Sequence, residues 1–186
     1  SVAAAVANAK LLAAAGHRAD AVAAARQGCE TEPRAVRLCE QLAALHAEAG
    51  DRAALEPVVG TLQALQPDGA ATHYFAAVAS FLAGDTGAAL THAERAIGKD
   101  AGYAAAYDLA GAAHTKLGHG ELARRAFETS LRFDPHDSTA YTNLGLLALA
   151  AGNRAAAVDL FAEALWLTPA DEQARTGMRQ ARAGTE

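Results

Sequence analysis

Seven histidines and two cysteines are the residues of this sequence best suited to metal binding, acid–base catalysis or redox chemistry. Metal sites need such side chains at set spacings, for example paired cysteines followed by paired histidines. The sequence contains no such arrangement. His46 and His114 lie on helical segments, where we expect each ring to pack against a neighbouring helix, and His17 and His119 lie in turns. We therefore expect no metal and no cofactor.

Motifs for nucleophilic catalysis or phosphate binding are missing as well. There is no nucleophile elbow, no phosphate-binding loop and no glycine-rich dinucleotide turn. Carboxylates are plentiful, and we expect all of them to be solvated. Glu121 and Arg125, for instance, lie four residues apart, a spacing typical of an exposed helical surface. The sequence argues against an enzyme.

Cys29 and Cys39 lie almost symmetrically about Pro33 and Arg34. If one helix ends before this turn and another begins after it, the two sulfur atoms can face each other and form a disulfide. Two cysteines do not make a disulfide framework, however, and the simpler interpretation is two small buried thiols in a reducing compartment. We expect the reduced pair, with the disulfide as the alternative.

Composition favours closely packed helices. The chain has 186 residues, of which 52% are hydrophobic and only 5% aromatic. Much of the hydrophobic fraction is alanine, which favours helices over sheets. The net charge of −5 is spread without a basic patch, so we expect neither nucleic acid nor an acidic membrane surface as a partner.

No stretch reaches the roughly 18 uninterrupted apolar residues that a membrane span needs, so we expect a soluble chain, cytoplasmic or periplasmic. The sequence starts at Ser1 rather than Met, and its first residues lack a basic segment and a long apolar core. We therefore expect a mature or excised fragment, from which an upstream signal or anchor could have been removed.

The clearest pattern is a period of 34 residues. It places glycines at Gly16, Gly50, Gly84, Gly118 and Gly152, and prolines at Pro33, Pro67, Pro135 and Pro169. Another column holds only small residues, namely Ala9, Ala43, Ala77, Gly111 and Gly145. Small side chains let two helix axes approach closely. Phe127 and Phe161 share a further column, where a large ring would fill the space under the next helix.

Residues 143–169 show what one period contains. The apolar spacing predicts helices over 144–151 and 154–167, broken at Gly152 and Asn153. The glycine accommodates a left-handed backbone, and the asparagine can cap the second helix, as Asp51 and Asp85 can in earlier periods. Neither helix can bury its apolar face alone. Stacking of successive periods would form one continuous core.

Two of the periods carry further residues of a known pattern. Tyr141, Leu144 and Gly145, followed by Ala157, Phe161 and Pro169, resemble the tetratricopeptide repeat signature, as does the segment from Tyr107 to Pro135. The resemblance implies an all-α protein, a right-handed α-solenoid of five helix-turn-helix repeats in a single domain over residues 1–186. The repeats would span approximately 2–35, 36–69, 70–103, 104–137 and 138–171, with a capping helix at 171–183.

Pro57 departs from this pattern. It lies well inside the second helix of the second repeat, where it removes one backbone hydrogen bond and clashes with the carbonyl four residues earlier. We expect a kink or a restart of the helix there. A hinge between the first two repeats and the rest is the functional alternative.

In tetratricopeptide proteins the first helix of each repeat lines a concave surface, and residues that packing does not use are available to a partner. This groove would comprise Arg37, Glu40, Gln41, Tyr74, Phe75, Val78, Phe81, Asp108, Lys116, Thr142, Asn143 and Leu146. Tyr74, Val78 and Phe81 recur at helical spacing and predict a pocket for hydrophobic anchors. The alternative is that Phe75 and Phe81 tuck beneath adjacent helices. The amide of Asn143 suits an extended peptide backbone.

We predict a protein–protein interaction scaffold or adaptor that binds a peptide or protein partner in this groove. The groove lacks the converging basic residues of a carboxylate clamp, since Glu40, Tyr74 and Asp108 hold the candidate places. Two alternatives are a substrate-recruitment module of a larger enzyme or secretion or assembly system, and a self-assembling oligomerisation unit. Ala5 and Gly28 leave the first repeat under-packed, which favours binding a second copy.

Overall fold

The computed structural model describes residues 2–31 and 36–183, and within them all regular structure is α-helical. The helices are α1 (Val2–Ala14), α2 (Arg18–Thr31), α3 (Val36–Glu48), α4 (Arg52–Leu65), α5 (Ala70–Leu82), α6 (Thr86–Lys99), α7 (Ala104–Lys116), α8 (Gly120–Phe133), α9 (Ser138–Ala150), α10 (Arg154–Leu167) and α11 (Glu172–Arg182). The predicted all-α class is confirmed. The helix expected over 144–151 begins earlier, at Ser138, because Asp137 caps it there.

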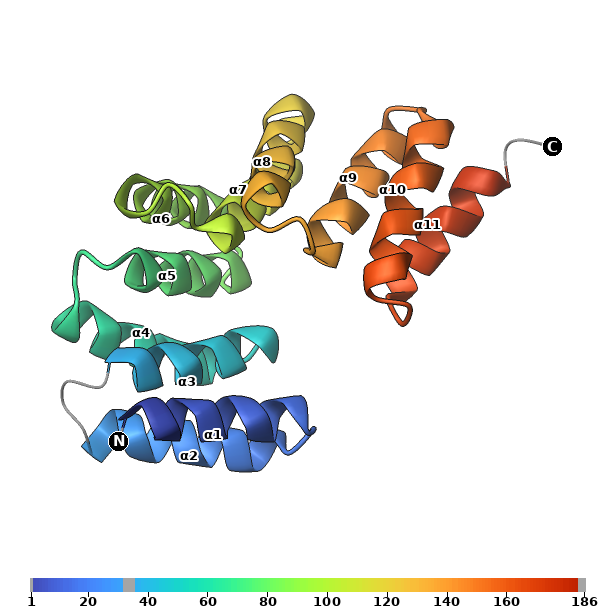
Figure 1. The fold of residues 1–186 in the computed structure, drawn as a ribbon. Coiled ribbons are helices and arrows are strands. Elements are labelled where there is room, and N and C mark those ends of the chain that lie inside the picture. Colours follow the sequence, from blue (N-terminus) through green and yellow to red (C-terminus); the bar gives the residue numbers. More distant parts are fainter. Residues whose placement is uncertain (1, 32–35, 184–186) are drawn as a thin grey trace. The chain divides into compact units, whose positions relative to one another are not determined.

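The chain divides into two compact units, residues 1–101 and residues 102–186. In the first unit each helix from α1 to α6 packs on the next, and α3 also packs on both α1 and α5. In the second unit each helix from α7 to α11 packs on the next, and α11 also packs on α9 (Figure 1). Each unit therefore has its own helix-to-helix core. The expected single domain stays a prediction.

The repeating glycines end the first helix of each pair. All five have a positive φ, between 64° and 82°, which is costly for residues that carry a Cβ. At the last of these turns the N–H of Gly152 donates to the carbonyl of Leu149, and the N–H of Asn153 donates to that of Ala148. These bonds satisfy carbonyls that the helix end leaves open. The predicted left-handed glycine turns are confirmed.

The predicted helix caps are also present. The side chains of Asp51, Asp85 and Asn153 accept hydrogen bonds from the backbone N–H three residues further on, at 3.0, 2.9 and 3.2 Å. His119 holds the same place before α8 and makes no side-chain cap bond. The residues at these four places thus mark where a second helix begins, and three of them also provide a side-chain cap.

Small residues are required where the first helix of a pair crosses the second. A Cβ added at Gly111 would lie 2.7 Å from the Phe127 ring, and one at Gly145 would lie 2.6 Å from the Phe161 ring. Both rings are fully buried. The predicted close approach of the helices, and the filling of the remaining space by these rings, are confirmed.

The expected restart at Pro57 is wrong, because α4 runs without interruption from Arg52 to Leu65. Leu55, Val58, Val59 and Leu62 are buried along its inner face. Pro57 is exposed, so its ring lies away from this core, and it cannot donate the helical hydrogen bond that the Ala53 carbonyl would otherwise accept. Burial of one helical face therefore keeps the proline inside a single helix.

The expectation of two separate thiols is also wrong. Cys29 of α2 and Cys39 of α3 form a disulfide, with Cα atoms 4.8 Å apart. The two helices pack on each other, which brings both cysteines to the same end of the pair. Pro33 and Arg34, expected in the turn between them, lie outside the described residues.

Candidate functional site

The predicted groove residues of the first unit lie on α3 and α5, which are neighbours in the structure. On α3, Arg37 is exposed and Glu40 and Gln41 are half-buried. On α5, Tyr74, Val78 and Phe81 are half-buried. The spacing of these three residues places them on one side of α5. The structure therefore places these polar residues on α3 and the apolar row on the neighbouring helix α5.

Phe75 is not a surface residue. Its side chain is only 5% exposed, and its ring lies edge-to-face with that of Tyr74, with 5.1 Å between the ring centroids. The other buried residues of α5 are Thr72 and three alanines, so Phe75 supplies the bulk that they lack. The alternative, in which phenylalanines tuck beneath adjacent helices, is therefore correct for Phe75. Phe81 retains an exposed part.

In the second unit the predicted residues are less uniform. Lys116 is exposed at the end of α7, and Asn143 and Leu146 are half-buried on α9. Thr142 was expected to meet a partner, but its side chain is only 2% exposed. Its hydroxyl donates to the Asp171 carboxylate at 2.7 Å. Thr142 therefore joins α9 to the start of α11 and offers no surface to a partner.

Asp108 corrects the expectation that all carboxylates are solvated. It is half-buried on α7, and its Oδ2 accepts a hydrogen bond from the buried hydroxyl of Ser130 at 2.8 Å. Burial, followed by hydrogen bonding to Asp137 and repulsion from its charge, raises the pKa of Asp108 to about 8. This raised pKa favours the protonated form of the groove residue at neutral pH.

Asp108 and Thr142 hold the same place in consecutive repeats, and so do Asp137 and Asp171. Asp137 caps α9 and Asp171 caps α11. In the last repeat the Thr142 hydroxyl donates to the capping carboxylate, and in the preceding repeat Asp108 lies close enough to Asp137 for that carboxylate to raise its pKa. The 34-residue spacing of both pairs was visible in the sequence and could have indicated this pairing.

The histidines pack as predicted for helical positions. His46 is 7% exposed, and burial lowers its pKa below the usual value. His114 is half-buried, with its ring centroid 5.7 Å from that of His119. In the described parts of the chain, no three histidines, cysteines or acids come close enough together to hold a metal ion. These imidazoles serve packing.

The second unit also contains a leucine-lined pocket of about 670 Å³, which the sequence pattern did not predict. Leu131 of α8, Leu144 and Leu147 of α9, and Leu160 of α10 form its apolar walls. At its edge Arg124 pairs with both Glu121 and Glu128. Only the last repeat has leucine at the places of both 147 and 160, which is the signal that could have revealed it.

Solved structures resemble the whole chain. The Cut9 complex with Hcn1 is 19% identical with a TM-score of 0.82, and the match covers 98% of this chain but 36% of that one. The TPR protein TTC0263 of Thermus thermophilus is 19% identical with a TM-score of 0.81, over 97% of this chain and 98% of that one. YrrB, a TPR protein with an unusual peptide-binding site, is 16% identical with a TM-score of 0.60, over 94% and 90%.

No protein-family model matches the sequence, and no curated protein matches it. The solved structures nevertheless share the arrangement of packed helices described above. The chain has the fold of tetratricopeptide-repeat solenoids. Within the described residues, no helix is both long enough and apolar enough to cross a bilayer.

Proposed function

We propose that this chain is a protein-interaction module that binds a peptide or a protein segment on the α3 and α5 surface of the first unit. The apolar row of Tyr74, Val78 and Phe81 holds hydrophobic anchors of the partner. The polar row of α3, with Arg37, bonds the polar groups beside them. The module carries out no chemistry on its partner.

The observation that carries this proposal is the partial exposure of Tyr74, Val78 and Phe81. Tyr74 and Val78 contact the core with one side while the other side meets solvent. Side chains held in this way are rigid and need little ordering on binding, so the partner gains apolar contact at a low entropic cost. YrrB, which shares the fold, has a peptide-binding site by its own description.

The experiment is a peptide selection followed by affinity measurement. Peptides selected on the wild-type chain are tested against a variant carrying both Tyr74→Ser and Phe81→Ser. Loss of two aromatic anchors should weaken binding about ten-fold or more. Trp166→Ser is the matched control, because Trp166 is 73% exposed and lies outside this surface.

Circular dichroism must show the same helix content in all three proteins. Equal affinity of the double variant and the wild type would refute the α3 and α5 surface as the binding site. Loss of binding in the Trp166→Ser control would place the partner on α10 instead.

The leucine-lined pocket of the second unit supports the same function on a second surface. Four leucines form its apolar walls, whereas the residues of α3 named above are polar. Its volume of about 670 Å³ is in the range of ligand-binding clefts. Leu147→Ser in the same selection tests this surface, since Leu147 is half-buried at the pocket wall. Recruitment for a larger enzyme or assembly system and self-assembly stay predictions.

A further inference from the structure

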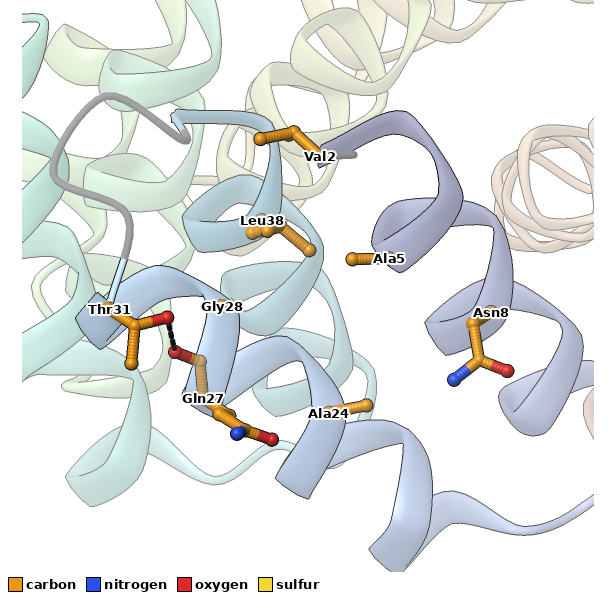
Figure 2. A pocket seen from close by; sticks show the side chains of 8 residues that line it. All are labelled: Val2, Ala5, Asn8, Ala24, Gln27, Gly28, Thr31 and Leu38. Carbon is orange, nitrogen blue, oxygen red and sulfur yellow. Dashed lines mark hydrogen bonds between the residues drawn. The ribbon is translucent and has the colours of Figure 1, made fainter.

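A pocket of about 360 Å³ lies between α1, α2 and the start of α3. Ala5 and Asn8 of α1 face it from one side, and Gln27 and Gly28 of α2 from the other, with Leu38 of α3 beyond them (Figure 2). Two of these residues, Ala5 and Gly28, have little or no side chain. The pocket is therefore the place where the first repeat is under-packed.

The second unit shows what fills the corresponding space in a later repeat. Tyr107 lies three periods of 34 residues after Ala5, and Phe133 lies three periods after Thr31. Their rings are stacked with centroids 5.8 Å apart. In the first repeat, both aromatic rings are replaced by small side chains on the same two helices. The corresponding place in the second unit thus carries two stacked aromatic rings, of which Tyr107 is half-buried and Phe133 is 49% exposed.

Leu38 compensates for only part of this loss. It stands where the second unit has Ala140, so it adds bulk from α3. A Cβ at Gly28 would lie 2.4 Å from a Leu38 methyl group, which shows how closely the leucine already presses on α2. Leu38 is 1% exposed and fixed in this position. The space that remains lies beside Ala5 and Thr31, the places of the missing rings.

We propose that this pocket binds a tyrosine or phenylalanine side chain of a separate protein partner. A ring would restore the packing that the second unit has, and burial of its apolar surface favours binding. Asn8 and Gln27 are exposed at the edge of the pocket, and their amides can both donate to and accept from the backbone of the bound segment. These amides favour a ring carried by a polypeptide over a free phenol.

A second copy of the chain is a poor source of this ring. All four of its tyrosines are half-buried, and Phe133, although 49% exposed, has its ring stacked on that of Tyr107. Trp166 is 73% exposed, but its indole is larger than the phenol ring that fills the corresponding space. The site involves α1 to α3 and not the apolar row of α5, so it goes beyond the proposed function and is tested separately.

The test is an NMR titration of the wild-type chain with three probes: acetyl-Ala-Tyr-Ala-amide, acetyl-Ala-Ala-Ala-amide and p-cresol. The tyrosine peptide should shift backbone amide signals of α1 and α2, and should bind about five-fold more tightly than p-cresol, a difference of about 1 kcal/mol. The alanine peptide should shift none of them. Ala5→Tyr, which refills the pocket as Tyr107 does, should weaken peptide binding about ten-fold or more.

Ala7→Tyr is the matched control, since Ala7 lies on the exposed side of the same helix and adds the same ring. It should bind the tyrosine peptide as the wild type does. If Ala5→Tyr does not fold, Thr31→Phe fills the same space from α2 and takes its place. The Tyr74→Ser and Phe81→Ser variant should keep this binding, which separates the two proposals.

Three results would overturn the proposal. The first is an absence of α1 and α2 shifts with the tyrosine peptide. The second is p-cresol binding as tightly as the peptide, which would make the pocket a small-molecule site. The third is a blue shift of Trp166 fluorescence that grows with protein concentration and is abolished by Ala5→Tyr, which would make a second copy the occupant.

Discussion

Replacing Asp108 by Asn should remove a pH dependence of stability that the wild-type chain has. In the last repeat, Thr142 donates a hydrogen bond to Asp171, the cap of α11. In the preceding repeat, Asp108 takes the donor's place opposite Asp137, the cap of α9. A carboxyl group can donate only while it is protonated. The amide of an asparagine has the same shape and donates at any pH.

The magnitude follows from the two pKa values of Asp108. Its pKa is raised from 3.8 to about 8 in the folded chain. Between these pH values the folded state holds one proton more than the unfolded state. The contribution of Asp108 to the free energy of unfolding is therefore fully present below pH 3.8 and is lost as the pH rises through about 8. The free energy of unfolding falls by at most about 1.4 kcal/mol per pH unit, or about 2 kcal/mol from about pH 6 to pH 8.

Thermal unfolding followed by circular dichroism at pH values between about 6 and 8 measures this difference. The unfolding midpoint of the wild type should fall by about 4–8 °C more than that of Asp108→Asn over this range. Asp108→Thr, which copies the last repeat, should behave like Asp108→Asn. Asp159→Asn is the control, because Asp159 is exposed on α10.

A constant difference in midpoint between the wild type and Asp108→Asn across this range would refute the reasoning. It would show that Asp108 is ionised in the folded chain at neutral pH. The bond across the repeats would then not depend on a proton.

Three further changes test the fold. Reduction of the disulfide between α2 and α3 should destabilise the first unit by about 2–3 kcal/mol, measured by urea unfolding with and without reductant, and equal midpoints would contradict this. Gly145→Ala should cost about 1–3 kcal/mol, because its Cβ would lie 2.6 Å from the Phe161 ring; Gly120→Ala, with no atom within 4 Å, is the control and should be neutral or slightly stabilising. Asp51→Ala should cost about 1 kcal/mol through loss of the α4 cap, and an unchanged urea midpoint would show that the cap contributes nothing.

Much of the fold could be predicted because its determinants act over a few residues. A glycine with a positive φ ends a helix and a capping residue directly after it begins the next, whatever lies around them. The recurrence of Gly152 and Asn153 equivalents every 34 residues therefore predicted the helix pairs. The small residues opposite Phe127 and Phe161 could be predicted for the same reason, since a repeated period implies a repeated crossing.

The candidate site could be predicted only in part. Spacing placed Tyr74, Val78 and Phe81 on one side of α5, and the structure finds these side chains half-buried. Spacing did not show that Phe75 lies in the core or that Thr142 bonds to Asp171, because these outcomes depend on residues of other helices. The leucine-lined pocket was missed because its walls come from three helices.

The sequence by itself determined where the first helix of each pair ends and the second begins, which residues repeat, and which places must stay small, because backbone sterics and capping bonds are local. Only the tertiary structure decided that Pro57 stays inside one helix, that Cys29 and Cys39 are joined, and that the pKa of Asp108 is raised. The burial of a side chain, the distance between two sulfur atoms and the free-energy cost of ionising a buried acid all depend on which residues the neighbouring helix places nearby. That information is spread over segments tens of residues apart, which a local pattern does not contain.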